Sequence, residues 1–386
     1  MDYLLSEELI DIRDMARQVA KEKIAPVAAH HDETGEFPWE IIKILAKMGF
    51  FSIYIDEEYG GLGLGIMGLT IATEELSRAC GGIALGFAGT ALGVLPLIIA
   101  GNEEQKQKYL PDLAEGKMLA SFSLTEPNAG SDASSIQTRA VLDGDEYVLN
   151  GVKHFITNGG VAKFNTVIAV TNPEKGARGA SAFIVEEGTP GFSYGKKEDK
   201  MGIRASITSE LIFEDCRIPK ENIIGKEGMG FPIAMRTLDR SRPGVAAQAL
   251  GIAQGALDHA VAYSRQRIQF GQPISALQAI QFKLANMATK IEAARNLIYH
   301  VARNIDAGEK NFSKEAAMAK YFASEVAMQV TTDAVQVFGG YGYMKEYPVE
   351  KYMRDAKITQ IYEGTSEVQQ GVIGKALIKE AAGKKS

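Results

Sequence analysis

Glu363 is the residue whose surroundings best suit it to acid–base chemistry. Residues 356–371 (AKITQIYEGTSEVQQG) surround it with apolar and aromatic neighbours, and Ile361 and Tyr362 stand directly before it. A carboxylate held partly out of water has a raised pKa and can serve as a general base. On this stretch alone, an ordinary surface glutamate before a helix-ending glycine is the simpler interpretation.

A helix–glycine–helix corner is the element that would position this carboxylate. The first helix would end at Gly364, which can adopt a positive φ. Either Thr365 or Ser366 would cap the second helix, whose first turn carries Glu367. Such a corner holds a side chain in a fixed place and brings backbone N–H groups close to a ligand.

Three further polar clusters lie at expected joints between elements. Residues 125–132 (TEPNAGSD) offer hydroxyls and backbone N–H groups suited to an anion or a flavin edge. Residues 154–159 (HFITNG) would put an aromatic ring and a hydroxyl on one face of a strand. Residues 265–271 (RQRIQFG) supply guanidinium groups for phosphate. Taken separately, each cluster is more typical of a turn or a solvated face.

Other catalytic motifs are missing. Residues 60–65 (GGLGLG) suggest a dinucleotide loop, but they follow an acidic turn and no strand–loop–helix unit surrounds them. The sequence has no GxxxxGK[ST], GxSxG or HExxH pattern, and its five histidines are scattered. Nucleophilic and metal catalysis therefore lack candidates.

The composition describes a globular chain with ample core. The 386 residues are 46% hydrophobic and 23% charged, and a net charge of -6 with dispersed basic residues argues against nucleic-acid binding. Cys80 and Cys216 form neither a metal pattern nor a disulfide framework, which fits a reducing compartment. The acidic, amphipathic start resembles neither a secretory signal nor a transit peptide.

Residues 81–100 are uncharged over about the length that spans a bilayer. Several glycines, Pro96 and the lack of flanking basic or aromatic belts argue against a membrane span. A buried helix pair lining an apolar cavity is the better interpretation.

Periodicity divides the chain into an α+β multidomain protein. We expect an N-terminal α-helical domain over 1–119, a middle antiparallel β domain over 120–229 and a C-terminal α-helical bundle over 230–386. The expected early helices begin at Ser6, near 37–40, over 69–78, and at Asn102 with an end near 110–111. The expected strands include 146–149, 165–170, 182–185 and 210–213. The later helices are expected over 243–267, with Pro243 in the first turn, and over 276–307 and 314–338.

Five motifs in this order resemble the acyl-CoA dehydrogenase family: TEPNAGSD, HFITNGG, SRQRIQFGQPI, DAVQVFGGYGY and EYPVEKYMRDAKITQIYEGTSE. The resemblance runs from the first helix to about Leu377. It is strongest to the short-chain, butyryl-CoA type, through residues 194–203 (YGKKEDKMGI) and 246–253 (AAQALGIA). It implies the family fold, with a β-barrel or sandwich in the middle and a four-helix bundle at the end. It also implies a homotetramer (a dimer of dimers) with one FAD per subunit, reoxidised by electron-transferring flavoprotein.

The resemblance also implies a reaction. Glu363 would remove the α-proton of an acyl-CoA while the β-hydride passes to flavin N5, giving a trans-2-enoyl-CoA. Some relatives carry the base at the position of Ser241, which cannot take that role here. The alternatives are a branched-chain or alicyclic acyl-CoA dehydrogenase, an oxygen-using flavin oxidase or monooxygenase of the same fold, and a non-catalytic CoA-binding protein.

Site residues follow from the resemblance position by position. The implied cofactor contacts are Phe122, Leu124, Thr125, Gly130, Ser131, Phe155, Thr157, Arg267, Phe270, Ile274, Gln278, Gln336, Gly339, Gly340, Thr365 and Glu367. The set around Arg267 and Phe270 would reach the FAD of a neighbouring subunit. The implied substrate contacts are Ser131, Asp239, Arg242, Phe87, Tyr362 and Gly364. No metal is implied. Relatives often have Trp at the Phe155 position and Gln at the Glu367 position.

The substrate and the compartment are further expectations. In the family, residues 81–100 help to form the acyl pocket, and here they offer Leu85, Phe87, Leu92 and Val94 without any Lys or Arg. A distal carboxylate buried there would lack a partner, so short uncharged acyl groups are expected, with butyryl-CoA first. We expect a cytoplasmic enzyme of bacterial type, with a mature mitochondrial matrix form as the alternative.

Overall fold

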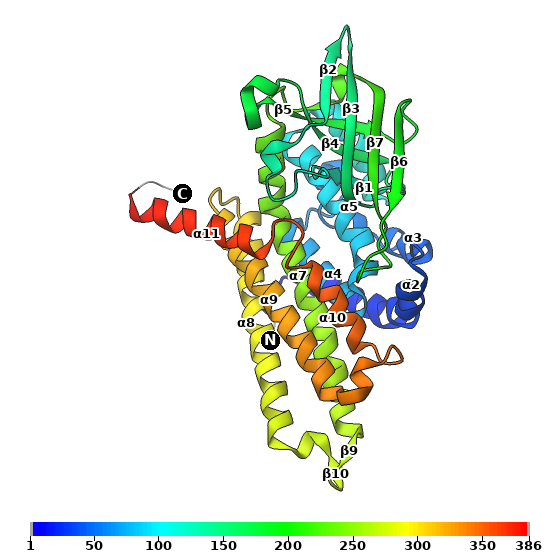
Figure 1. Ribbon diagram of the computed structural model, residues 1–386, viewed down its shortest axis with the longest axis vertical. Coiled ribbons are helices and arrows are strands. Elements are labelled where there is room, and N and C mark those ends of the chain that lie inside the picture. The colour runs from blue at the N-terminus through cyan, green and yellow to red at the C-terminus, as the bar shows by residue number, and fades with distance from the viewer. Residues whose placement is uncertain (1–2, 384–386) are drawn as a thin grey trace.

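The computed structural model describes residues 3–383 and has three parts (Figure 1). A group of helices comes first, a β-sheet follows, and a long helical bundle ends the chain. The sheet lies at one end of the long axis, and the β9–β10 hairpin of the bundle lies at the other. This order of helix, sheet and bundle confirms the predicted fold class. The domain boundaries at 119/120 and 229/230 stay a prediction.

Six α-helices form the N-terminal part. They are α1 (Glu7–Val19), α2 (Ala28–Thr34), α3 (Trp39–Lys47), α4 (Gly65–Ala79), α5 (Gly81–Ala100) and α6 (Glu103–Ala114). Local caps start two of them, because Ser6 accepts a hydrogen bond from the N–H of Leu9 and Asn102 forms a capping box with Gln105. The predicted end of α6 near 110–111 was wrong, because the helix continues through Pro111. Likewise, α4 starts four residues before the predicted position.

The charge-free stretch folds as one helix, α5, and the predicted helix pair was wrong. Among residues 3–383 this is the one helix long and apolar enough to span a membrane, and 72% of its apolar window is buried inside the protein. Glycines along it allow close packing: a Cβ at Gly93 would lie 2.6 Å from the backbone nitrogen of Ser121 in β1. The absence of charge in α5 is therefore explained by its place in the core.

The middle part is a mixed sheet. Its strands are β1 (Ala120–Ser123), β2 (Arg139–Asp143), β3 (Glu146–Thr157), β4 (Phe164–Val170), β5 (Ala180–Glu186), β6 (Phe192–Lys197), β7 (Thr208–Pro219) and β8 (Ile223–Ile224). The order is β6-β7-β3-β2-β4-β5-β8, with β1 beside β4. The predicted strands are present, but a purely antiparallel sheet was wrong, because β1 and β2 both pair with β4 in parallel.

The C-terminal part is built on long helices. They are α7 (Gly230–Gln266), α8 (Gln278–Asp306), α9 (Ser313–Phe338), α10 (Val349–Ile358) and α11 (Ser366–Ala381), with the short hairpin of β9 (Ile268–Gln269) and β10 (Gln272–Pro273) between α7 and α8. The predicted start of α7 at Pro243 was wrong, since the proline lies inside a 37-residue helix. Packing of α7 along α4 and α9 outweighs the local preference of proline for a first turn. This longer helix carries Asp239, Ser241 and Arg242.

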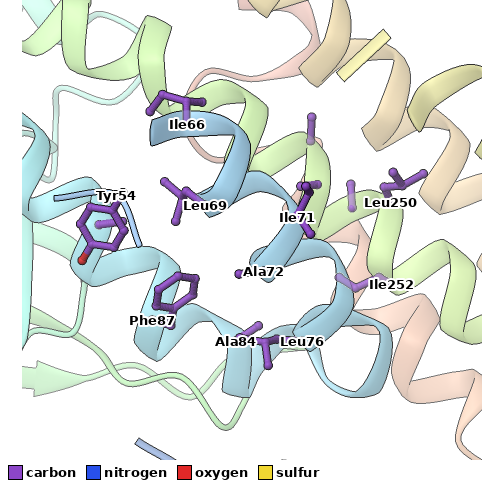
Figure 2. Close-up of a cluster of buried hydrophobic side chains, with 14 of the residues drawn as sticks. Tyr54, Ile66, Leu69, Ile71, Ala72, Leu76, Ala84, Phe87, Leu250 and Ile252 are labelled. Atoms are coloured by element: carbon purple, nitrogen blue, oxygen red, sulfur yellow. The ribbon is translucent and has the colours of Figure 1, made fainter. Parts of the chain in front are cut away.

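One hydrophobic core joins the N-terminal helices to the bundle. In Figure 2, side chains of α4 and α5 meet Leu250 and Ile252 of α7, and all of these side chains are buried. Each large aliphatic side chain removed from water contributes about 1.5–3 kcal/mol to folding. A second cluster fills the sheet. The shared core holds α5 and α7 at a fixed separation. Both helices pack against α10, and the candidate site lies in the connection between α10 and α11.

Candidate active site

Glu363 lies in the connection between α10 and α11, which makes the sharp corner expected from the sequence. The predicted helix end at Gly364 was wrong, because α10 ends at Ile358 and residues 359–363 form turns. Its own φ is 51° and that of Gly364 is 95°, so two successive residues adopt the left-handed conformation. Only the glycine does so without steric cost, which means that the surrounding contacts must hold Glu363 in place. Thr365 caps α11 by accepting a hydrogen bond from the N–H of Val368 at 3.3 Å.

Two buried side chains from other positions hold the carbonyl groups of this corner. The amide of Gln369 donates to the oxygens of Glu363 and Gly364 at 3.0 and 3.1 Å. The ammonium group of Lys320, from α9, donates to the Gly364 oxygen at 2.7 Å. The backbone N–H of Glu363 itself has no hydrogen-bond partner among the described residues. The corner therefore keeps a donor free beside the carboxylate.

The Glu363 carboxylate is enclosed by α7 and α9. The hydroxyl of Ser241 donates to its Oε2 at 2.5 Å. Burial raises the pKa of Glu363, and the Ser241 hydrogen bond and the charges of Lys320 and Arg242 oppose that rise. A carboxyl with a raised pKa that is still stabilised as an anion is suited to accept a proton. Ser241, which cannot act as a base, thus lies against the residue that can.

Asp239 and Arg242, expected at the substrate, lie beside Glu363. They form a largely buried ion pair, and the hydroxyl of Ser313 donates to Asp239 at 2.9 Å. Burial lowers the pKa of Arg242, and its Nε has no hydrogen-bond partner among the described residues. An unpartnered guanidinium N–H can donate a hydrogen bond to an anionic or carbonyl group of a ligand. Their contact with CoA stays a prediction.

Tyr362 connects the corner to α5. Its hydroxyl donates to Gln248, whose amide donates to the oxygen of Gly81 at 3.0 Å. Phe87 is different, because it is fully buried against Phe50, Phe51 and Tyr54. Figure 2 shows its ring in this core cluster beside Tyr54. A role for Phe87 in limiting acyl-chain length has no support in these contacts and stays a prediction.

The segment expected at the flavin, residues 124–131, is pinned by a buried ion pair. The ammonium group of Lys153 contacts Glu126 at 2.7 Å and the oxygen of Leu124 at 3.0 Å. Glu126 also accepts from the backbone N–H groups of Gln137 and Thr138, at 2.6 and 2.9 Å. The pair gives this irregular segment one defined shape.

Polar groups of this segment and of β3 are free for a ligand. Among the described residues, the hydroxyls of Thr125, Ser131 and Thr157 have no hydrogen-bond partner. The ring of Phe155 is 60% exposed. Its φ of 59° accompanies a shift of register in β3 between Lys153 and Ile156. Ile156 is buried between the exposed Phe155 and the half-buried Thr157, and the shared face of Phe155 and Thr157 stays a prediction.

The predicted cofactor residues within 267–278 and 336–340 lie at the end of the bundle that carries the β9–β10 hairpin (Figure 1). Four of them line a cleft of about 550 Å³: Arg267, Ile274, Gly339 and Gly340. Its wall includes Tyr341, over whose ring the Arg267 guanidinium lies at 5.2 Å. Phe270, at the β9–β10 turn, is 89% exposed. Gln278 and Gln336 are exposed in the same region. One chain therefore does not bring the two predicted groups together.

The glycine-rich residues 60–65 lead into a helix N-terminus that is already occupied. The carboxylate of Asp306 accepts from the N–H groups of Ile66 and Met67, both at 2.8 Å. A Cβ at Gly65 would lie 2.4 Å from that carboxylate. The first turn of α4 therefore binds a side chain of the protein. This agrees with the rejection of a dinucleotide loop at residues 60–65. Within residues 3–383, no group of three or more His, Cys, Asp or Glu could hold a metal ion.

Lys320 and Gln369 were missed at the sequence level. Lys320 stands on the buried stripe of α9 with Ala316, Ala323 and Ala327, where a helical period leads one to expect an apolar residue. That mismatch was a usable signal. Gln369 carried none, because a glutamine in the first turns of an amphipathic helix is ordinary.

Three family models match almost the whole chain. They are the N-terminal, middle and C-terminal domains of acyl-CoA dehydrogenase, over residues 6–117, 121–216 and 228–378. The acyl-CoA dehydrogenase, short-chain specific, of Clostridium acetobutylicum is 53% identical over 375 residues, which cover 97% of this chain and 98% of that protein.

Solved structures agree with this match. Butyryl-CoA dehydrogenase from Megasphaera elsdenii is similar with a TM-score of 0.95 and 51% identity, over 98% of this chain and 100% of that one. A chain solved in work on the electron transferring flavoprotein of Acidaminococcus fermentans is similar with a TM-score of 0.96 and 54% identity, over 98% and 100%.

Proposed function

Because the chain belongs to the acyl-CoA dehydrogenase family, we propose that it oxidises a short-chain acyl-CoA, with butyryl-CoA first, to the trans-2-enoyl-CoA. One observation carries the proposal: an enclosed carboxylate, that of Glu363, lies beside the free N–H of the same residue at a strained corner. A base and an oxyanion donor in one rigid turn are the two groups that α-proton removal requires.

The chemistry of the chain's own residues follows from this arrangement. Glu363 takes the α-proton onto its carboxylate. The Glu363 N–H donates to the thioester carbonyl oxygen, where negative charge develops as the proton leaves. Ser241 stabilises the ionised carboxylate before the transfer. The corner is half-buried, and partial removal from water strengthens each of these interactions.

FAD fits the free groups of the middle part. Thr125, Ser131 and Thr157 offer unpartnered hydroxyls, and Phe155 offers an exposed ring, all close to the pinned segment 124–131. When bound, FAD supplies the acceptor for the hydride that leaves the β-carbon. The free hydroxyls would hold its polar edge and Phe155 would cover its ring.

A second subunit is proposed to complete the cofactor site. The β9–β10 hairpin, whose turn carries Phe270, lies at the opposite end of the molecule from the sheet that contains β1, the strand before Thr125 (Figure 1). Phe270 is almost fully exposed. In a homotetramer, the end of the bundle that carries the β9–β10 hairpin would reach the FAD of the neighbouring subunit. Arg267→Ala should then lower both FAD occupancy and tetramer stability, measured by flavin absorbance and analytical ultracentrifugation. Arg236→Ala, at an exposed arginine near the start of the same helix, is the matched control. A monomer that retains full FAD would contradict this arrangement.

Electron-transferring flavoprotein is the proposed acceptor of the electrons, since a close structural relative was solved in work on such a protein. An oxygen-using flavin oxidase is the second candidate of the same fold. Stopped-flow mixing of the holoprotein with butyryl-CoA separates the two. A dehydrogenase should lose flavin absorbance and keep the bleached state in air until the flavoprotein is added. Rapid recovery in air alone would favour the oxidase, and no bleaching would refute both.

The acyl group is proposed to be short and uncharged. Helix α5 carries no Lys or Arg, so a distal carboxylate near it would be buried without a partner at a cost of several kcal/mol. Each methylene that fits contributes only about 0.8 kcal/mol, so kcat/KM should change gradually with chain length. A charged acyl group should lower kcat/KM much more strongly. The test is kcat/KM for butyryl-, isobutyryl-, cyclohexanecarboxyl-, octanoyl- and glutaryl-CoA. A preference for glutaryl-CoA would refute the pocket argument. A preference for the cyclohexane or isobutyryl substrate would change only the acyl group.

A further inference from the structure

Lys320 is a buried lysine without an acidic partner. It is 0% exposed on α9, and its Nζ donates to the carbonyl oxygen of Gly364 at 2.7 Å. Among the described residues it forms no ion pair, whereas the other buried lysines do: Lys153 with Glu126 and Lys351 with Asp355. A buried charge is costly unless it is paired, so a lysine kept in this position calls for an explanation.

Among the described charged side chains around the Glu363–Gly364 corner, Lys320 is the cation that has no ion-pair partner. From α7, Arg242 faces Glu363 but is paired with Asp239. On α9, Glu325 accepts hydrogen bonds from the neutral donors Gln360 and Ser366, and its charge acts on Lys320 less strongly than that of Glu363 does.

The remaining elements add little charge of their own. On α11, Glu367 is exposed and acts on Lys320 only at a distance. On the α10 side, Tyr362 presents a neutral hydroxyl that is bonded to Gln248. The carboxylate that acts most strongly on Lys320 is therefore Glu363.

We propose that Lys320 is a positioning residue for the base: its ammonium group holds the Gly364 carbonyl, and its charge keeps the neighbouring Glu363 carboxylate ionised. The hydrogen bond fixes the peptide that follows Gly364, one residue beyond Glu363, and thereby supports the left-handed turn in which the Glu363 N–H stays free. The charge offsets the burial of the carboxylate. This inference rests on the proposed function, in which Glu363 is the base.

The titration behaviour agrees in sign. Burial lowers the pKa of Lys320 to about 8, while Glu363 acts to raise it. In return, the charge of Lys320 lowers the pKa of Glu363 against the effect of burial. Loss of this charge should therefore raise the pH at which Glu363 becomes ionised.

The first test is the pH profile of kcat/KM for butyryl-CoA in Lys320→Met. The acid limb should move upward by about one pH unit, the size expected for loss of one nearby charge. At a pH below the acid limbs of both the wild type and Lys320→Met, a limb shifted upward by one pH unit makes the kcat/KM of the variant tenfold lower. Lys320→Arg, which retains the charge, should return the limb toward that of the wild type. Lys357→Met, an exposed lysine on α10, is the matched control and should leave the limb unchanged.

The second test does not depend on turnover. Infrared difference spectroscopy of the holoprotein can follow protonation of Glu363, with the band assigned by its loss in Glu363→Gln. The midpoint should rise in Lys320→Met and also in Lys320→Gln, which keeps a donor near Gly364 without the charge and serves if the methionine variant does not fold. An unchanged midpoint in the folded variants would overturn the proposal. A wild-type protein that does not oxidise any acyl-CoA would refute the proposed function and leave this measurement valid.

Discussion

Two segments of the chain, residues 124–131 and residues 362–366, are each held by a buried lysine that donates to a backbone carbonyl oxygen. Lys153 binds the oxygen of Leu124 at 3.0 Å, and Lys320 binds that of Gly364 at 2.7 Å. Burial lowers the pKa of both lysines to about 8. The difference lies in the second partner, because Lys153 also contacts Glu126 and Lys320 has no carboxylate of its own.

This difference separates Lys153, which has a structural role, from Lys320, which we propose as a positioning residue for the base. In the first segment a carboxylate neutralises the charge locally, so the pair supports the shape of the loop and little else. In the second the charge acts on Glu363, the group that we propose as the base. The same residue type and the same backbone contact thus serve two purposes, according to what lies beside them.

The largest effect should come from removing the carboxylate at the corner. Glu363→Gln keeps the shape of the side chain but cannot accept the α-proton, so turnover of butyryl-CoA should fall by ~10²–10⁴. The bound flavin spectrum and circular dichroism should stay those of the wild type. Turnover close to normal in this variant would remove the distinction between the two segments, because the corner would then carry no base.

Breaking the pair in the first segment should reduce stability. In Glu126→Ala, Lys153 remains buried without a counter-charge, and the free energy of unfolding should fall by about 3–5 kcal/mol. Urea denaturation at a fixed protein concentration measures this. The double variant Glu126→Gln/Lys153→Met removes both charges and should recover part of the loss. Equal losses in the single and double variants would mean that the ion pair is not what pins the loop.

Ser241→Ala should affect the acid limb. The kcat/KM of the wild type should rise with pH through the pKa of Glu363, because the base must be ionised and burial has raised that pKa. The Ser241 hydrogen bond lowers it, so its removal should move the limb to higher pH. A hydrogen bond to a charged group contributes about 1.5–3 kcal/mol, which corresponds to roughly a tenfold or greater loss at low pH. Ser241→Thr keeps the hydroxyl and is the control. A downward shift of the limb would contradict the assignment.

The smallest effect is expected on stability at the corner. Lys320→Met removes a buried charge. The carboxylate most affected by the loss of this charge is Glu363, which can become neutral by taking up a proton. The free energy of unfolding should change by less than about 1.5 kcal/mol, as for other volume-conserving replacements. Lys153→Met, which strands Glu126, should cost clearly more under the same conditions. Equal losses of the free energy of unfolding in the two variants would show that the two lysines are alike, and would contradict the distinction drawn between them.

Local chemistry made part of this protein readable from its sequence. Periods of 3.6 and 2 residues predicted the succession of helices, sheet and bundle, because each element must bury one face. The corner was equally readable, since a glycine with positive φ and a capping threonine act within a few residues of Glu363. The motifs around these positions carried the family resemblance.

Tertiary structure decided what local patterns do not record. Ser241 reaches Glu363 across 122 residues and Lys320 reaches Gly364 across 44, and neither contact is contained in a helical period. Packing also carried α7 through Pro243, and the sheet gained parallel pairs because β1 enters it beside β4 from the helical part. The type and position of the base are local properties of the chain. Its ionisation depends on side chains that only folding brings together, because an electrostatic effect depends on distance in space and on burial.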